Sequence, residues 1–325
     1  MIRDLDRFEV IADEDELKWF FEHVIQKPQV NESYAAVFVA RFKKLTAEER
    51  AEVGIAKKDA EFLATQTFRV RKFHDAAELA EDDGWNMVNF VKKLKRFNVD
   101  KGAYLTSGGY PLPEKCIATI FYVNPCDELK VADEVMQKLN DTKTAIVKAM
   151  LNGKTLDTNL QSYQNFSNIE SNVKHARAHC KGSVYWLDFD LDVPPWFKDH
   201  ASCYQGYYSQ MLDSLNQRFG LGNYLIIDTS GGYHILVKTR AIHGNPHHFC
   251  EDMQGIYWKA ITMDGCMPYI DEKGVDKFEC IVNDSQIPGI PLPGTYQYGR
   301  PVRILNKEDF TKDNITKVFK NSLKN

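Results

Sequence analysis

The feature that most constrains the fold is an alternating segment near the middle of the chain, residues 184–192. Successive side chains of a strand point to opposite faces, so alternate residues share a face. One set is apolar, and the other carries Asp188, Asp190 and Asp192. The pattern predicts a strand that packs one face on a core and carries carboxylates about 6.6 Å apart on the other. The apolar set is Tyr185, Leu187, Phe189 and Leu191.

Carboxylates that share one strand face repel each other unless a cation offsets their charge. Mg²⁺ and Mn²⁺ prefer oxygen ligands and leave coordination positions open for phosphate. We therefore predict that Asp188 and Asp190 ligate Mg²⁺ or Mn²⁺, with Asp192 as a bystander. The alternative is a strand end with solvated acids. A calcium loop does not fit, because the sixth position from Asp188 is Val193 rather than glycine.

A glycine turn follows about forty residues later, between predicted strands at 223–229 and 233–239. Ser230, Gly231 and Gly232 form the turn, and glycines there leave backbone amides open to an anion. His234 and Lys238 share one face of the returning strand. We predict that these five residues bind the phosphates of a nucleotide; the alternative is an ordinary hairpin with a surface histidine.

A third segment places Asp284 at the end of the apolar run that begins at Ile281. Pro293-Gly294-Thr295 follows, and then Arg300 and Arg303, which would add positive charge near phosphates. The alternative is a rigid loop and an edge strand with solvated arginines.

The chain has 325 residues, 43% of them hydrophobic, and a formal net charge of −4. This length suggests about two domains, and the mild acidity argues against tight passive binding to duplex DNA. A glycine- and proline-rich stretch at 107–113 is the best boundary. We expect an N-terminal α/β region at 1–110, packed on a core at 111–325 that ends in a short helix.

Hydrophobic periodicity predicts alternating helices and strands, and hence an α/β or α+β chain. The predicted helices are 14–24, a short one opened by the capping box Thr46 to Glu49, 85–97, 127–151, 204–219 and 247–262. The predicted strands are 34–42, 66–73, 116–123, 183–191, 223–229, 233–239, 278–283 and 302–305.

The seven cysteines include no C-x-x-C pair, and the N-terminus has no signal-peptide pattern. We therefore expect a cytoplasmic protein without disulfides and without a membrane partner. Two His/Cys clusters offer zinc ligands, but their spacing makes a structural zinc the less favoured interpretation. The clusters are His243, His247, His248 and Cys250, and His175, His179 and Cys180.

Taken in order, these segments resemble the archaeo-eukaryotic primase superfamily, many of whose members come from phages and plasmids. Leu187 to Asp190 is similar to its Asp-x-Asp strand, Ser230 to His234 to its second motif, and Val282 to Asp284 to its third. Pro293-Gly294-Thr295 and the strand that ends at Asn124-Pro125 also resemble family segments. The resemblance covers roughly residues 115–305.

The resemblance implies a primase catalytic core with an RRM-like half, preceded by the N-terminal α/β extension. It implies Asp188, Asp190 and Asp284 as catalytic metal ligands, with Asp276 as an alternative third ligand, and Ser230 and His234 on the nucleotide phosphates. The implied activity is a DNA-directed nucleotidyltransferase, or primase-polymerase, that joins NTPs or dNTPs on single-stranded DNA. Because no Walker A pattern is present, a separate helicase or other replication proteins would unwind the template. The expected location is then the cytoplasm, or the host cytoplasm for a phage-encoded chain.

Two rival interpretations remain. A haloacid-dehalogenase-like phosphatase also uses a strand followed by Asp-x-Asp, with Asp188 as nucleophile and Asp190 as acid. A nucleic-acid-binding replication module with a vestigial metal site would need neither carboxylate for catalysis.

Overall fold

The protein is an α+β chain built on antiparallel sheets, seen here in a computed structural model. No helix among the described residues combines the length and apolar character needed to cross a bilayer. The described residues are 7–26, 28–40, 45–52, 54, 63–70, 87–100, 110, 113, 116–153, 169–263, 270–271, 274–275, 278–284 and 287–310.

The first sheet has five strands in the order β12-β7-β9-β8-β16, and every neighbouring pair is antiparallel. Along the chain, the first four strands and two helices follow the order β-α-β-β-α-β. Together with the spatial order, this is the ferredoxin-like arrangement of two interleaved β-α-β units. The elements are β7 (Trp186–Asp192), α8 (Ala201–Phe219), β8 (Tyr224–Asp228), β9 (Gly232–Lys238), α9 (His247–Met263) and β12 (Glu279–Asn283), with β16 (Arg303–Ile304) at the edge.

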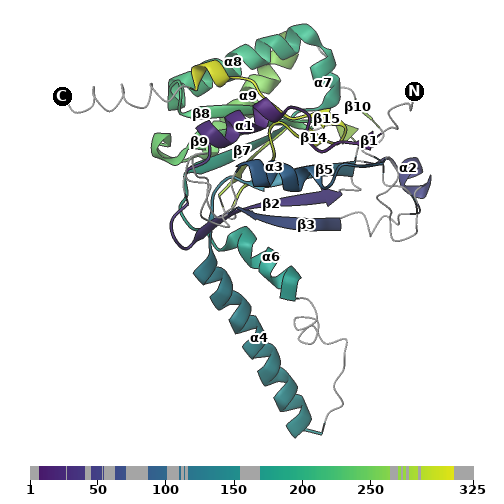
Figure 1. Cartoon of the computed structure of the whole chain (residues 1–325). Helices are drawn as coiled ribbons and strands as arrows, with labels where there is room; N and C mark the ends of the chain where they lie inside the picture. Colours follow the sequence, from purple (N-terminus) through teal and green to yellow (C-terminus); the bar gives the residue numbers. More distant parts are fainter. Residues whose placement is uncertain are drawn as a thin grey trace, which may run out of the picture.

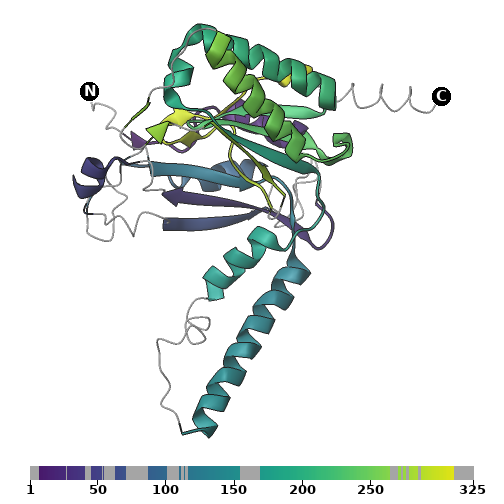
Figure 2. The ribbon, with the colours of Figure 1, turned by 180° about the vertical axis from the view of Figure 1, so that it is seen from behind.

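Helices α8 and α9 cover one face of this sheet, as Figures 1 and 2 show from opposite sides. The predicted apolar face of β7 packs there, through Phe189 and Leu191. Tyr207 and Met211 of α8 are fully buried against it. The strand predicted from the alternating pattern is therefore confirmed, and its carboxylates lie on the face away from these helices.

The second sheet is formed by segments from both ends of the chain, in the order β15-β14-β5-β2-β3. In addition, β13 pairs with β5, and β6 pairs with β2. Strands β2 and β3, which come from the N-terminal region, therefore share this sheet with strands from later in the chain. The elements are β2 (Glu32–Ala40), β3 (Leu63–Val70), β5 (Ile117–Tyr122), β6 (Cys126–Asp127), β13 (Gly289–Pro291), β14 (Tyr296–Gln297) and β15 (Arg300–Pro301).

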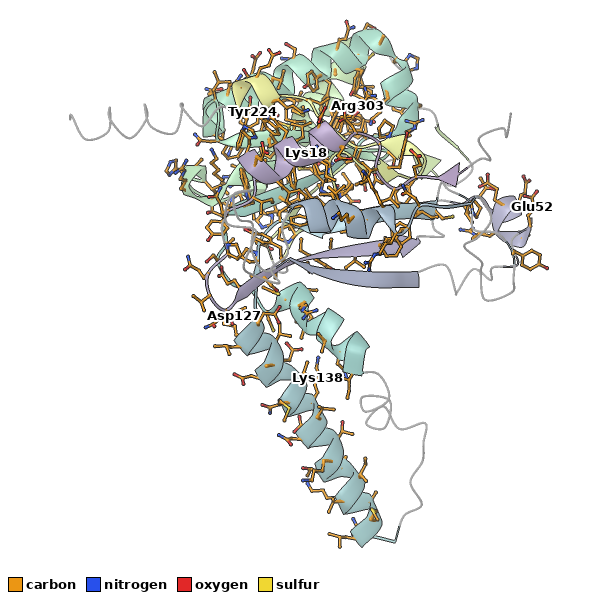
Figure 3. The ribbon with its side chains drawn as sticks, viewed as in Figure 1. Lys18, Glu52, Asp127, Lys138, Tyr224 and Arg303 are labelled. Carbon is orange, nitrogen blue, oxygen red and sulfur yellow. The ribbon has the colours of Figure 1, made fainter. Side chains whose placement is uncertain are left out.

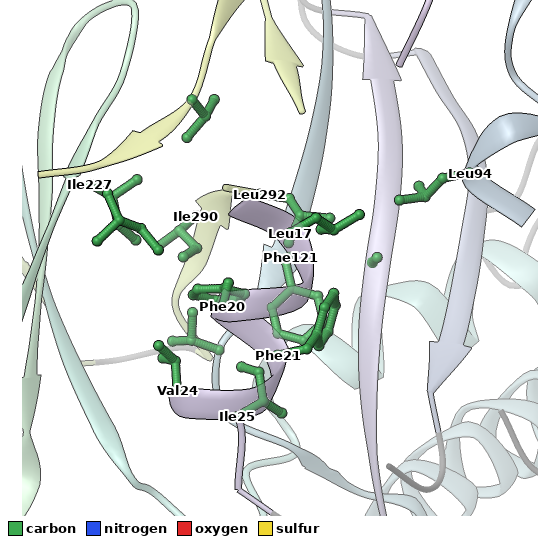
Figure 4. Packing of buried hydrophobic residues seen from close by; sticks show 14 of the residues in the cluster. Leu17, Phe20, Phe21, Val24, Ile25, Leu94, Phe121, Ile227, Ile290 and Leu292 are labelled. Atoms are coloured by element: carbon green, nitrogen blue, oxygen red, sulfur yellow. The ribbon is translucent and has the colours of Figure 1, made fainter. Parts of the chain in front are cut away.

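Helix α1 (Glu14–His23) lies between the two sheets and joins their cores (Figure 4). Phe20 and Phe21 of α1 meet Phe121 of β5 edge-on, and the same cluster includes Ile227 of β8. Helix α3 (Met87–Lys95) adds Leu94 to it. One continuous hydrophobic core therefore connects the N-terminal segments to the five-stranded sheet.

Asn124 fixes the start of β7 against the second sheet. Its Oδ1 accepts hydrogen bonds at 2.9 Å from the backbone N–H groups of Tyr185 and Trp186, and its Nδ2 donates to the Trp186 carbonyl at 2.7 Å. Asn124 is buried, so water does not compete for these bonds. One side chain thus sets where the carboxylate strand begins.

Helices α4 (Glu128–Leu151) and α6 (Ile169–His179) project from the body (Figures 1 and 2). The predicted cap of α4 is confirmed, because Asp127 accepts from the N–H groups of Leu129 and Lys130. Val131 and Val135 pack near the base of α4, whereas Lys138 already lies on the projecting part (Figure 3). The base of α4 is therefore anchored by apolar contacts.

The other predicted elements lie within a few residues of the observed ones. The capping box is confirmed, since Thr46 and Glu49 exchange side-chain to backbone hydrogen bonds at the start of α2. The expected C-terminal helix and most of the 107–113 turn lie outside the described residues. Further elements are α2 (Ala47–Glu52), α7 (Pro195–Asp199), β1 (Arg7–Phe8), β4 (Val99–Asp100), β10 (Ile270–Asp271), β11 (Gly274–Val275) and the 3₁₀ helices η5 (Thr239–Ala241) and η6 (Lys307–Asp309).

The expectation of a chain without disulfides is wrong at one position, because Cys203 is disulfide-bonded. The thiols of Cys116, Cys126, Cys180, Cys250 and Cys280 are free.

Replacing Asn124 by alanine is expected to lower the free energy of unfolding by about 2–3 kcal/mol, because buried N–H and C=O groups of β7 lose their partners. Urea denaturation measures the change. Asn140→Ala, at an exposed position of α4, is the matched control and is expected to leave stability within about 0.5 kcal/mol. Equal midpoints for the two variants would contradict the role given to Asn124.

Candidate functional site

Three strands bring polar side chains together on the face of the five-stranded sheet that points away from α8 and α9. In the strand register, Asp190 of β7 lies opposite His234 of β9, and Asp188 of β7 lies opposite Asn283 of β12. Directly opposed residues project to the same face of an antiparallel sheet. The pairing therefore gathers two acids, one imidazole and one amide.

The contacts within this group centre on Asp188, which is fully buried. The Nδ1 atom of His234 lies 3.1 Å from both Asp188 carboxylate oxygens, and Asn283 Nδ2 donates to Asp188 Oδ2 at 2.7 Å. On its other side, His234 Nε2 lies 3.5 Å from Asp190 Oδ1. We call Asp188, Asp190, His234 and Asn283 the carboxylate cluster.

The charge state of His234 follows from its position between two acids. Burial alone would lower the pKa of His234, but the charges of Asp188 and Asp190 outweigh burial and raise it to about 9. His234 is therefore protonated at neutral pH, and its imidazolium compensates the buried negative charge. This cation holds the two carboxylates on one face.

Asp190 is the member of the carboxylate cluster that is open to ligands, since 36% of its side chain is exposed. Asp192, two residues further along the strand, is exposed and lies opposite Gly232 of β9 and Glu279 of β12, outside the contacts of the carboxylate cluster. Access to the carboxylate cluster is therefore through Asp190.

The turn of the β8–β9 hairpin precedes the strand that carries His234. The Ser230 N–H donates to Gln297 Oε1 at 2.9 Å, which ties the turn to β14. Ser230 Oγ is buried and has no hydrogen-bond partner among the residues described. Gly231 accepts from the backbone of Val193 through its carbonyl. The unpartnered hydroxyl is the group in this turn whose bonding a ligand would complete.

Gly232 is required by packing. A Cβ atom at this position would lie 1.8 Å from the carbonyl oxygen of Leu191 on the neighbouring strand. Any side chain here would push β9 away from β7. One of the two predicted phosphate-binding glycines therefore already has a structural reason to be glycine.

The structure does not bring Asp284 to the carboxylate cluster. Register places Asn283 opposite Asp188, so the next residue is directed away from the shared face. The Asp284 side chain is 54% exposed, and its Oδ2 lies 3.8 Å from His247 Nε2. Asn283 instead occupies the third position. The alternative ligand Asp276 lies outside the described residues.

Lys238 is also held away from the carboxylate cluster, although it shares the face of His234. Its Nζ donates to the Gly222 carbonyl at 2.6 Å and lies 4.4 Å from the centre of the Phe310 ring. Burial, followed by the charge of Arg240, lowers the pKa of Lys238 to about 8. These contacts hold the Lys238 side chain at the end of β9 that is farthest from the β8–β9 turn.

Arg300 and Arg303 line a separate cavity of about 340 Å³. Arg303 lies opposite Asp228 in the pairing of β16 with β8. Asp228 alternates with Tyr224 and Ile226, which pack on the helix side of the sheet. The predicted arginine contacts therefore lie on the other side of the sheet from the carboxylate cluster.

The donor chemistry of the carboxylate cluster fits a hard divalent cation: two carboxylates on one strand, an amide carbonyl on Asn283 and a half-exposed Asp190. The orphaned Ser230 hydroxyl supports a ligand beside it. In the structure, the His234 imidazolium occupies the place between the acids. Across the described ranges, no three His, Cys, Asp or Glu side chains converge as a ready metal cage.

The proposed zinc clusters are not assembled as one site either. His247 contacts Asp284, while His243 and His248 are exposed. His175 and His179 pack ring against ring with centroids 4.3 Å apart, and Cys180 donates to Glu134. In the part of the chain that is described, neither set of side chains is gathered around one point.

Two contributors to this site were not found from sequence, Asn283 and Asn124. Asn283 was missed because its place opposite Asp188 depends on the register between β12 and β7. For Asn124 the signal was its position at the end of a buried strand before Pro125.

Comparison with known proteins adds no relative: no family model, no curated protein and no solved structure matches this chain.

His234 is expected to make stability depend on pH in buffer that contains EDTA. Its pKa is raised on folding from 6.5 to about 9, so its stabilisation is fully present below pH 6.5 and is lost as pH rises through about 9. The difference corresponds to about 3 kcal/mol. Urea denaturation from pH 6 to 10 should show the gap between wild type and His234→Gln closing over this window. A gap that does not change with pH would contradict the prediction.

Gly232→Ala is expected to destabilise the fold by more than about 3 kcal/mol, because the added methyl overlaps the backbone of Leu191. Gly206→Ala is the matched control, since a Cβ there meets no atom within 4 Å. Thermal denaturation of both variants measures the difference, and equal melting temperatures would refute the steric argument.

Proposed function

We propose that the protein is a nucleotidyltransferase of the primase type, which joins NTPs or dNTPs on a single-stranded DNA template. The observation that carries the proposal is the carboxylate cluster on the face of a ferredoxin-like sheet that points away from α8 and α9. Asp188 and Asp190 stand on one strand of that sheet, and His234 follows a Ser-Gly-Gly turn on the next. This combination of fold half and residues supports a primase core with an RRM-like half.

In this proposal each of the polar residues of the site has a separate role. Asp190, half-exposed, contacts the incoming ligand, while Asp188 is fixed by Asn283 and His234 and keeps the geometry constant. His234 contributes positive charge beside the phosphates, and Ser230 offers its unpartnered hydroxyl. Preorganised charge of this kind stabilises the transition state more than the ground state.

Asp188 and Asp190 would hold Mg²⁺ or Mn²⁺. Such an ion, when bound, supplies activation of the attacking 3′-hydroxyl and charge stabilisation of the leaving pyrophosphate. A bound cation would add to the positive charge of His234 in offsetting the negative charge of the two acids.

The phosphatase rival is not favoured by the sheet. It needs its further catalytic lysine and acidic residues on parallel strands, whereas β7 is antiparallel to both of its neighbours. The non-catalytic replication module shares the same fold and differs only in lacking activity. An activity assay, rather than the geometry of the site, therefore distinguishes this module from the proposed enzyme.

The deciding experiment incubates the purified chain with single-stranded DNA, labelled NTPs or dNTPs, and Mg²⁺ or Mn²⁺. Wild type is expected to make oligonucleotides, and Asp190→Asn is expected to lose at least ~100-fold of the rate, since several kcal/mol of charge stabilisation is removed. Asp192→Asn is the matched control, because Asp192 is on the same strand but outside the carboxylate cluster, and is expected to retain activity.

Each other outcome names a different function. No product from wild type with either metal overturns the proposal and leaves the binding module. Hydrolysis of p-nitrophenyl phosphate that depends on Asp188, and that DNA does not affect, indicates the phosphatase. Equal product from wild type and Asp190→Asn would also reject the proposal, because the carboxylate cluster would then be dispensable.

A further inference from the structure

A second polar site lies at the edge of the five-stranded sheet where β16 pairs with β8. It is the cavity of about 340 Å³ introduced above, a volume at the lower end of the range for small-molecule sites. Its lining comes from α7, α8, β8 and β15–β16, so four separate parts of the chain converge there. The lining residues are Lys198, Tyr204, Asp228, Thr229, Arg300, Pro301 and Arg303.

Charge in this cavity is unbalanced. Three cations, Lys198, Arg300 and Arg303, surround one carboxylate, Asp228. Lys198 Nζ lies 3.7 Å from Asp228 Oδ1 and donates to the Thr229 carbonyl at 3.4 Å. Neither arginine forms an ion pair or a side-chain hydrogen bond with any residue that the structure describes. Two guanidinium groups are therefore left facing the cavity region with donor capacity to spare.

The environment strengthens the pull on an anion. Burial lowers the pKa of Lys198, and the charge of Arg300 adds to this effect although Asp228 opposes it. Burial raises the pKa of Asp228, although the three cations oppose the rise. A bound anion would offset the cost that burial and the charge of Arg300 impose on the Lys198 cation.

One aromatic side chain, Tyr204, lines the site, and Tyr233 packs behind it. The Tyr204 ring is stacked on Tyr233 with centroids 6.5 Å apart, and Lys198 Nζ lies 5.2 Å from the centre of the Tyr233 ring. Burial, followed by the charge of Asp228, raises the pKa of Tyr204 to about 12, so its hydroxyl remains a hydrogen-bond donor. Tyr204 thus offers the site both an aromatic ring and a hydroxyl donor.

We propose that this cavity is a phosphate-binding site, formed by Lys198, Arg300, Arg303 and Tyr204, that takes a phosphate group of a nucleotide or of a nucleic-acid backbone. Guanidinium forks match phosphate oxygens in pairs, and lysine adds a point charge. Because Asp228 repels anions, the site is expected to bind only ligands whose negative charge is large enough to overcome that repulsion.

The phosphate-binding site is distinct from the carboxylate cluster. Asp228 and Arg303 project to the helix side of the sheet, whereas Asp188 and His234 project to the side of the second sheet. The inference therefore does not rest on the proposed polymerase activity. A chain that joined no nucleotides could still bind phosphate here, and the experiment keeps the two questions apart.

The test is isothermal titration calorimetry in EDTA, on an Asp190→Asn background that disables metal-dependent nucleotide binding at the carboxylate cluster. The probes are pyrophosphate, ATP, adenosine and a single-stranded oligothymidylate with a 5′-hydroxyl. At least one phosphate-bearing probe is expected to bind and adenosine is not. The double change Arg300→Gln with Arg303→Gln is expected to raise Kd at least ~10-fold, because charge-assisted hydrogen bonds are lost.

A matched charge control removes two lysines from the projecting helix, Lys143→Gln with Lys148→Gln, and is expected to leave Kd unchanged. Lys138 and Arg303 are labelled in Figure 3, and α4 runs away from the region of Arg303. Arg300 and Arg303 are exposed, so the double variant should fold, which its thermal denaturation curve verifies.

The set of probes that bind identifies the source of the phosphate and tests the proposal. Binding of pyrophosphate and ATP identifies a free nucleotide as the source of the phosphate, and binding of the oligothymidylate alone identifies the backbone. The proposal is overturned if no phosphate-bearing probe binds at millimolar concentration. It is also overturned if adenosine binds as well as ATP, or if the arginine double variant binds like the lysine control.

Discussion

A fully buried carboxylate constrains this structure more than any other single group. Asp188 has no exposure, and an uncompensated charge there would cost several kcal/mol. Compensation comes from two strands: His234 of β9 supplies positive charge, and Asn283 of β12 supplies an N–H donor. Both partners reach Asp188 only in the observed register, because a slip of one residue would turn them to the other face. The charge thus specifies the pairing of three strands.

The rest of the fold keeps that face covered. Helix α1 lies between the two sheets, and its aromatic residues contact β5 while sharing a core with β8. The segment 287–304 crosses from one sheet to the other, since β13 and β14 pair with β5 and β16 pairs with β8. Gly294, at φ +80°, accepts backbone hydrogen bonds from the start of α1 within this crossing. A low-dielectric environment for Asp188 therefore depends on residues from both ends of the chain.

Sequence reasoning succeeded where the signal is local. The alternation in β7, the Asp127 cap and the capping box at Thr46 each depend on neighbours within a few residues, and each is confirmed. It failed where the register between strands determines which residue faces the site. Nothing local distinguishes Asn283 from Asp284 as the residue that faces Asp188, and the shared sheet of β2 and β5 joins segments about eighty residues apart. Arg303 was expected near the same nucleotide phosphates as His234. The spacing of residues along the chain does not reveal that its strand partner is Asp228.

The two polar regions use opposite solutions to the same electrostatic problem. On the face toward the second sheet, acids outnumber bases, and one imidazolium held between Asp188 and Asp190 offsets part of their charge. On the helix side, bases outnumber acids, and Asp228 balances only part of the charge of Lys198 and the arginines. The net charge of −4 does not show this separation, because it adds the charges of both regions, whereas a ligand binds at only one of them. Since Thr229 lines the cationic cavity and Ser230 follows it in the β8–β9 turn, a single hairpin connects the two regions.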